Sequence, residues 1–161
     1  MMGLKRILSG LAGDKLGAVS LETALIAPVL LSMSVGSYEA SRIVARQSEL
    51  QIASAEASSV ALASEPTSPS RRATLKGILQ TSTGLDQDHV AVDAAYRCGS
   101  TTTYATDATG CGTNLISSYI KISLTDSYAP VWTQFGIGNA VPLNVTRYVM
   151  IKQQTTSTDA I

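Results

Sequence analysis

One charged residue interrupts a long uncharged stretch near the start of this 161-residue chain. Between Lys15 and Glu39 the only charged side chain is Glu22. The run from Leu16 to Tyr38 is about 23 residues long, which at about 1.5 Å per helical residue is enough to cross a bilayer with some tilt. A carboxylate in such a segment costs up to about 3.5 kcal/mol of insertion free energy, less near the interface. An anchor alone would gain from Leu here, so the sequence predicts a specific role for Glu22.

A basic leader precedes the apolar run. Residues 1–17 carry Lys5, Arg6 and Lys15 against a single acidic residue. A secretory signal has its small-residue cleavage site after the apolar core, whereas here Gly17 comes before it. The excess of basic residues predicts that the leader stays in the cytoplasm and that the remainder is exported. An uncleaved signal-anchor is the alternative interpretation.

A helical pattern continues past the apolar run, with no Gly or Pro between Tyr38 and Pro66. Small and apolar residues recur near one helical face, which predicts an amphipathic stem of about 25 residues that continues the membrane helix. The residues expected on that face are Ile43, Leu50, Ala53, Ala57, Val60 and Ala61, and those expected mostly elsewhere are Arg42, Arg46, Glu49 and Glu56.

The sequence after residue 64 predicts a small domain. Two prolines break the stem, and Ser70 is expected to cap a short helix over residues 71–80 that ends at Gly84. Its expected buried face comprises Leu75, Ile78 and Leu79. Alternating apolar residues predict strands over 90–98, 116–125 and 141–151. The expected fold class is therefore α+β: a long transmembrane and stem helix, then an exported domain with a short helix and an antiparallel sheet of about three strands.

The two cysteines, Cys98 and Cys111, enclose a polar loop with almost nothing to bury. In an exported domain such a pair is most simply a disulfide. Metal binding is the alternative, but two thiolates without nearby His or further Cys cannot complete a tetrahedral site. No metal and no cofactor are expected.

Catalysis and nucleic-acid binding find little support in the sequence. Twelve basic residues balance twelve acidic ones, so electrostatics give no reason to expect nucleic acid as a partner. The single His89 and the lack of a Gly-x-Ser-x-Gly motif leave no credible triad. Asp86 and Asp88 could form a weak cation site with His89, but a solvated turn before a strand explains them better. We expect that the chain is not an enzyme.

The stretch from Gly17 to Glu22 resembles the processing site of type IV pilin-like proteins, which a prepilin peptidase cuts after the glycine. The resemblance makes Ala18 the first mature residue and Glu22 the fifth. The wider pattern over residues 17–62 resembles the TadE-like family, pilin-like components of tight-adherence (Flp/Tad) pili, and the similarity is weak beyond residue 62. Residues of this wider pattern are Ala24, Pro28, Gly36, Glu39 and Arg42. Leu21 departs from the more usual Val before the glutamate.

The resemblance implies a minor pilin or pseudopilin of the bacterial inner membrane, with a single pass, a cytoplasmic N-terminus and a periplasmic or extracellular domain. The expected division is a cleaved leader (1–17), a transmembrane helix and stem (18–64) and an exported domain (65–161). The implied partners are prepilin peptidase, other pilin-like subunits, the pilus assembly machinery and inner-membrane lipid. A new amine at Ala18 would be cationic and could pair with a neighbour's Glu22.

Two other classes of protein remain as alternatives to a minor pilin of a Tad-type pilus. One is a membrane-anchored exported adhesion or binding domain that never enters a filament. The other is a pseudopilin of a type II secretion machine, which shares the leader pattern but usually has Phe at the first mature position, where this chain has Ala18.

Overall fold

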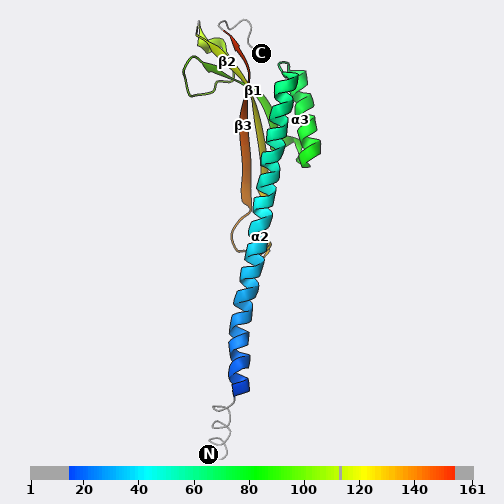
Figure 1. Ribbon diagram of the computed structural model, residues 1–161, viewed down its shortest axis with the longest axis vertical. Coiled ribbons are helices and arrows are strands. Elements are labelled where there is room, and N and C mark those ends of the chain that lie inside the picture. The colour runs from blue at the N-terminus through cyan, green and yellow to red at the C-terminus, as the bar shows by residue number, and fades with distance from the viewer. Residues whose placement is uncertain (1–14, 113, 155–161) are drawn as a thin grey trace, which may run out of the picture. The chain divides into compact units, whose positions relative to one another are not determined.

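The computed structural model describes residues 15–112 and 114–154, and the chain divides into two compact units, one ending at Arg42 and one beginning at Ile43. The helices are α2 (Lys15–Ser64) and α3 (Pro69–Thr83), and the strands are β1 (Val90–Cys98), β2 (Ile116–Tyr128) and β3 (Val141–Gln154) (Figure 1). Short 3-10 turns form η1 (Gln87–His89), η2 (Thr109–Cys111) and η3 (Val131–Phe135). The predicted α+β class is confirmed. Most of the predicted leader, residues 1–14, lies outside the described residues.

The strands form an antiparallel sheet in the order β1-β2-β3. The register pairs Val90 with Leu124 and Tyr128 with Val141, so each strand follows its neighbour in sequence. Alternation along the strands puts one set of side chains on each face. The pairing of β2 with β3 is irregular between Ser118 and Tyr119, where an extra residue of β3 is accommodated.

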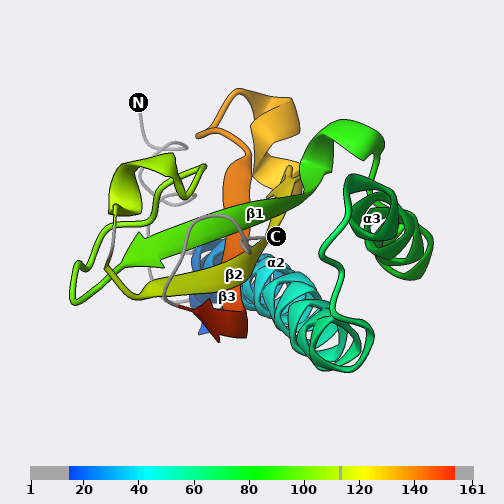
Figure 2. The same ribbon diagram turned by 90° about the horizontal axis from the view of Figure 1, so that it is seen from above.

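One face of the sheet packs against α3 and residues 43–64 of α2, which lie on the same side of it (Figure 2). The core includes Leu50, Ala53, Ala57 and Ala61 of α2, Leu75 and Leu79 of α3, Val90 and Val92 of β1, Ile120, Ile122 and Leu124 of β2, and Leu143, Val145 and Val149 of β3. The alanines of α2 let the helix approach its neighbours closely. The prediction for Val60 was wrong: it is 41% exposed, while Ser54 is buried in the same part of the helix.

Helix α3 begins two residues earlier than the sequence indicated. Ser68, rather than Ser70, is the N-cap: its hydroxyl accepts a hydrogen bond from the Arg71 backbone N–H at 3.3 Å. Pro69 then occupies the first turn, where a missing N–H costs nothing. Gly84 ends the helix as expected, in a left-handed conformation with φ 68°. Ile78, predicted to be buried, is exposed.

Candidate functional site

The first part of α2 presents apolar side chains that the folded chain leaves uncovered. The large hydrophobic residues exposed there are Val19, Leu21, Leu25, Ile26, Val29, Leu30, Leu31, Met33 and Val35. At 100° per residue these positions are distributed around the whole helix rather than along one stripe. Among the described residues, α2 is the helix that is long and apolar enough to cross a membrane. Lipid or other helices are therefore needed to cover this segment.

Hydroxyl groups within the apolar segment are satisfied by its own backbone. The side chain of Thr23 donates to the Val19 carbonyl at 2.9 Å, and that of Ser34 donates to the Leu30 carbonyl at 2.8 Å. Ser32 donates at 2.7 Å to the carbonyl of Pro28, which lies inside the helix. These bonds reduce the cost of placing hydroxyls in hydrocarbon and leave small polar residues compatible with close helix packing.

Glu22 differs from these hydroxyls because it has no partner in the part of the chain that the structure describes. It is exposed, and among the described residues its side chain forms no ion pair or hydrogen bond. Ala18 and Glu22 are four residues apart in α2, so both lie on one helical face, one turn apart. The backbone of Gly17 is helical, and the side chain of Ala18 lies outside the described part of the chain. The predicted processing residues, Gly17 and Ala18, and the predicted pairing residue, Glu22, thus lie within about one and a half turns of α2.

The second part of α2 is fixed to the sheet by a half-buried ion pair that the sequence analysis placed on the polar face of the helix. The Arg46 Nε donates to the Asp126 Oδ2 at 2.7 Å, and Nη1 donates to the Glu49 Oε2 at 2.8 Å. Arg46 also donates at 3.3 Å to the carbonyl of Thr83, the last residue of α3. One guanidinium therefore ties together both helices and β2.

The electrostatics of this pair favour both charges. Hydrogen bonds from Arg46 to Glu49 and to Asp126 outweigh burial and raise the pKa of the guanidinium. Partial burial raises the pKa of the Asp126 carboxyl, but hydrogen bonds from Arg46 and from the Ser127 N–H, together with the Arg46 charge, outweigh burial. The net effect holds the pKa of Asp126 below its ordinary value.

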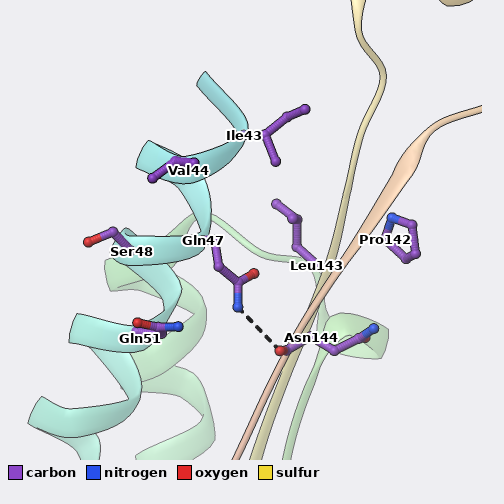
Figure 3. A pocket seen from close by; sticks show the side chains of 8 residues that line it. All are labelled: Ile43, Val44, Gln47, Ser48, Gln51, Pro142, Leu143 and Asn144. Atoms are coloured by element: carbon purple, nitrogen blue, oxygen red, sulfur yellow. Dashed lines mark hydrogen bonds between the residues drawn. The ribbon is translucent and has the colours of Figure 1, made fainter. Parts of the chain in front are cut away.

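A groove of about 660 Å³ runs between this part of α2 and the start of β3 (Figure 3). Ile43, Val44 and Gln47 line its helical side. Pro142 and Leu143 line its strand side, together with Asn144. The Gln47 side-chain amide donates to the Asn144 carbonyl at 3.4 Å and closes one side of the groove. The lining contains no charged side chain.

Cys98 and Cys111 are joined by a disulfide whose Cα atoms lie 5.1 Å apart. Ala108 is the one buried residue of the loop between them, in agreement with the expectation that this loop has almost nothing to bury. Ala108 and Cys111 pack with Tyr96 and Ile116 in a second small core. This core anchors the loop to the end of the sheet, so the disulfide closes a segment that is also held by packing.

The acidic residues before β1 lie on the surface. Asp86 precedes η1, and Asp88 and His89 lie within it, all exposed. The Thr125 hydroxyl lies 3.4 Å from the His89 Nδ1 and donates at 3.3 Å to the His89 carbonyl. In the part of the chain that the structure describes, no three His, Cys, Asp or Glu side chains gather as a metal site would require.

Comparison with known protein families matches residues 17–59 to the model of TadE-like proteins. The match begins at Gly17, includes Glu22 and ends within the part of α2 that packs on the sheet. The resemblance inferred from these residues is therefore confirmed over this range. No curated protein and no solved structure gave a significant match. A TadE-like helix implies a minor pilin-like protein associated with a Tad pilus, with pilin-like partners.

Proposed function

We propose that this TadE-like chain is a minor pilin or pseudopilin of a Tad/Flp-type pilus that assembles through its N-terminal helix. The observation that carries the proposal is the family match over residues 17–59, on a helix whose first part has uncovered apolar side chains. The carboxylate within that apolar part, Glu22, has no partner among the described residues. The precursor would lie in the bacterial inner membrane with residues 1–17 in the cytoplasm, as the basic leader favours. Prepilin peptidase would cut after Gly17.

Cleavage would create a cationic partner for Glu22. The new amine at Ala18 would be cationic near neutral pH. Within a bundle of helices, the Glu22 carboxylate of one subunit would pair with the Ala18 amine of its neighbour, because pairing offsets the desolvation cost of both charges. The same pairing would set the axial register between subunits, since only one offset of the helices brings the two groups together.

The small residues of the apolar segment support helix association. Gly36 has open space around its Cα, and the back-bonded Ser32 and Ser34 present only small side chains. Such residues let helix backbones approach closely in membranes. The exported domain is bulky for a major filament subunit, which favours a role in pilus initiation, at the tip or in adhesion.

A membrane-anchored exported binding domain that stays outside a filament is the second candidate. The length and apolar character of α2 favour it equally, because a span of this kind anchors a domain without any partner. This second candidate does not explain why a carboxylate, Glu22, lies within the apolar segment. It also predicts that the leader is retained.

Processing separates the two candidates. The full chain is expressed in cells with an active prepilin peptidase, purified from membranes and measured by intact mass and N-terminal sequencing. We expect a mature chain that begins at Ala18. Gly17→Leu should leave the full-length precursor, whereas Gly13→Leu, a matched change at another leader glycine, should still be processed. Retention of residues 1–17 by the unaltered chain in competent cells would reject the pilin proposal.

A further inference from the structure

The sheet face opposite the helices carries three tyrosines that contact one another, Tyr104, Tyr119 and Tyr148, called here the tyrosine cluster. The rings of Tyr104 and Tyr148 are stacked, with centroids 3.8 Å apart and planes at 12°. Tyr119 meets Tyr104 edge-to-face, with centroids 5.2 Å apart. Tyr104 and Tyr148 remain 38% and 36% exposed. The cluster is a rigid aromatic surface that the chain itself does not cover.

The loop that carries Tyr104 is fixed in position. Tyr96 and Ala105 exchange two backbone hydrogen bonds of 2.9 and 2.8 Å, which add a short bridge beside β1. The Arg97 guanidinium lies 5.6 Å from the Tyr104 ring centroid and donates to the Thr101 carbonyl at 2.8 Å. With the disulfide, these contacts hold the Tyr104 ring in place, so a ligand would not need to order it.

The turn that leads back to the disulfide is held by a carboxylate. Asp107 accepts hydrogen bonds from the hydroxyl and the backbone N–H of Thr109. These bonds lower the pKa of Asp107 and keep the carboxylate charged. The loop is therefore restrained on both sides of Tyr104.

A cavity of about 400 Å³ lies beside the cluster, lined by Tyr104, Tyr148, Asp93 and Lys121 among others. Ala95 and Thr106 are small and leave room between the rings and the strands. Asp93 and Lys121 are cross-strand partners, yet among the described residues neither side chain forms an ion pair or a hydrogen bond. The hydroxyls of the tyrosine cluster likewise have no hydrogen-bond partner among these residues.

We propose that this cavity binds a neutral oligosaccharide with equatorial hydroxyls, of the β-1,4-linked glucose or N-acetylglucosamine type. A sugar of this configuration has apolar C–H faces that pack on aromatic rings, and it has hydroxyls at its edges. The Asp93 carboxylate would accept hydrogen bonds from these hydroxyls, and the Lys121 ammonium would donate to them. Arg72 also lines the cavity, but its guanidinium donates to the Thr67 carbonyl at 2.8 Å. Lys121 and Asp93, one positive and one negative group, are therefore the charged side chains left to meet the hydroxyls of a ligand without net charge. The volume fits a small-molecule site.

This inference does not depend on assembly into a pilus, and the two can fail separately. The probes are cellohexaose and chitohexaose, added to the full chain in lipid nanodiscs, because sugar-based detergents would compete. Saturation-transfer NMR with irradiation of the aromatic protons measures contact between rings and sugar. We expect the strongest transfer to H1, H3 and H5 of the bound residues, the axial protons of one pyranose face.

Variants identify the site. Tyr148→Ala should weaken binding by about tenfold, the effect expected for loss of an aromatic contact of roughly 1.4 kcal/mol. Tyr148→Phe should retain most of the binding, since it keeps the ring, and Asp93→Asn should weaken it. Phe135→Ala is the matched control, because Phe135 is an aromatic residue that is 75% exposed and does not line the cavity.

Three outcomes would overturn the proposal. One is no transfer above that of empty nanodiscs for either probe, with the disulfide intact and the fold verified by circular dichroism. Another is binding that Tyr148→Ala and Phe135→Ala reduce equally. The third is self-association of the chain that Tyr148→Ala abolishes while neither saccharide binds, which would identify the face as a contact between copies.

Discussion

In residues 19–38 of α2 the large apolar side chains are exposed around the whole helix, whereas in residues 43–64 the buried residues lie on one face. The second part uses mostly alanine on that face and packs it against α3 and the sheet. The first part uses Leu, Val, Ile and Met with no cover from the chain. One helix therefore combines a segment that requires an external apolar environment with a segment that belongs to the hydrophobic core shared with α3 and the sheet.

The carboxylates of the two units differ in the same way. Asp126 has a partner within the fold, and the Arg46 guanidinium lies 2.7 Å from it. Glu22 has none among the described residues. A charge without an internal partner in an apolar segment indicates a partner from another molecule, which is why Glu22 rather than Asp126 is the residue to test for assembly.

The largest effect on assembly is expected from Glu22→Leu. The substitution removes a desolvation cost, so membrane insertion and cleavage after Gly17 should be unchanged. Loss of the pairing with the Ala18 amine should lower incorporation into pili by about tenfold, the result of roughly 1.4 kcal/mol per contact. The measurement is the amount of mature protein in sheared pili relative to the amount in membranes.

Glu22→Gln should be incorporated into pili at a level between those of Glu22→Leu and the unaltered chain, because it retains hydrogen bonding and loses the charge. Thr23→Val, at the neighbouring position, serves as a control that changes a polar residue satisfied by its own helix. Recovery of Glu22→Leu in pili at the level of the unaltered chain would mean that the carboxylate is only tolerated.

The next prediction tests whether the two parts of α2 contribute differently to stability. Leu50 is completely buried, so Leu50→Ala should lower the free energy of unfolding of the unit that begins at Ile43 by about 3–4 kcal/mol. Leu62→Ala, in the same part of the helix but exposed, should change it by less than about 0.5 kcal/mol. Leu30→Ala, in the apolar segment, should leave it unchanged. Denaturant unfolding of the nanodisc-bound chain, followed by Trp132 fluorescence, measures all three. Equal losses for Leu50→Ala and Leu62→Ala would contradict the core described here.

The disulfide provides the third prediction. Cys98→Ser should lower the free energy of unfolding by about 2–3 kcal/mol, since closing a loop of this length restricts the unfolded chain. Insertion of α2 should be unaffected, because the loop belongs to the other unit. Alkylation of the unaltered protein should label no cysteine before reduction and both Cys98 and Cys111 afterwards. Labelling of both without reductant would reject the bond.

Local patterns in the sequence predicted much of this fold, and two of the features that they missed depend on residues far apart in the chain. The alternation from Val90, Ile116 and Val141 located the three strands, because a half-buried strand has period two. The burial of Arg46 could not be read from the sequence, since its partner Asp126 is 80 positions away. Its neighbours within α2 indicate only an exposed helix face.

The tyrosine cluster was missed for a similar reason. Tyr119 and Tyr148 occupy outward positions of adjacent strands, a signal that was present but not decisive. Their meeting with Tyr104 depends on the irregular register after Ser118 and on the path of the disulfide loop, neither of which a single strand pattern encodes. The pairing of Glu22 stays a prediction, because it concerns a second molecule.

The smallest expected effect concerns the ion pair that contrasts with Glu22. Asp126→Asn should lower the free energy of unfolding at neutral pH by about 1 kcal/mol, as for a hydrogen-bonded pair that is partly exposed. The folded protein holds the pKa of Asp126 below its unfolded value, so the unfolded state binds more protons in acid. The contribution of the pair is therefore fully present above the unfolded pKa, about 3.9, and is lost as the pH falls through the lower folded value.

Unfolding measured at a series of pH values tests this sign. The unaltered chain should lose more stability than Asp126→Asn as the pH falls from about 6 to about 3, so that the two curves converge in acid. Asp88→Asn, at an exposed carboxylate without a side-chain partner among the described residues, should follow the unaltered chain. If the curves of Asp126→Asn and the unaltered chain ran parallel, the bond to Arg46 would not stabilise the fold. The two carboxylates would then differ only in location, and the contrast with Glu22 would lose its energetic basis.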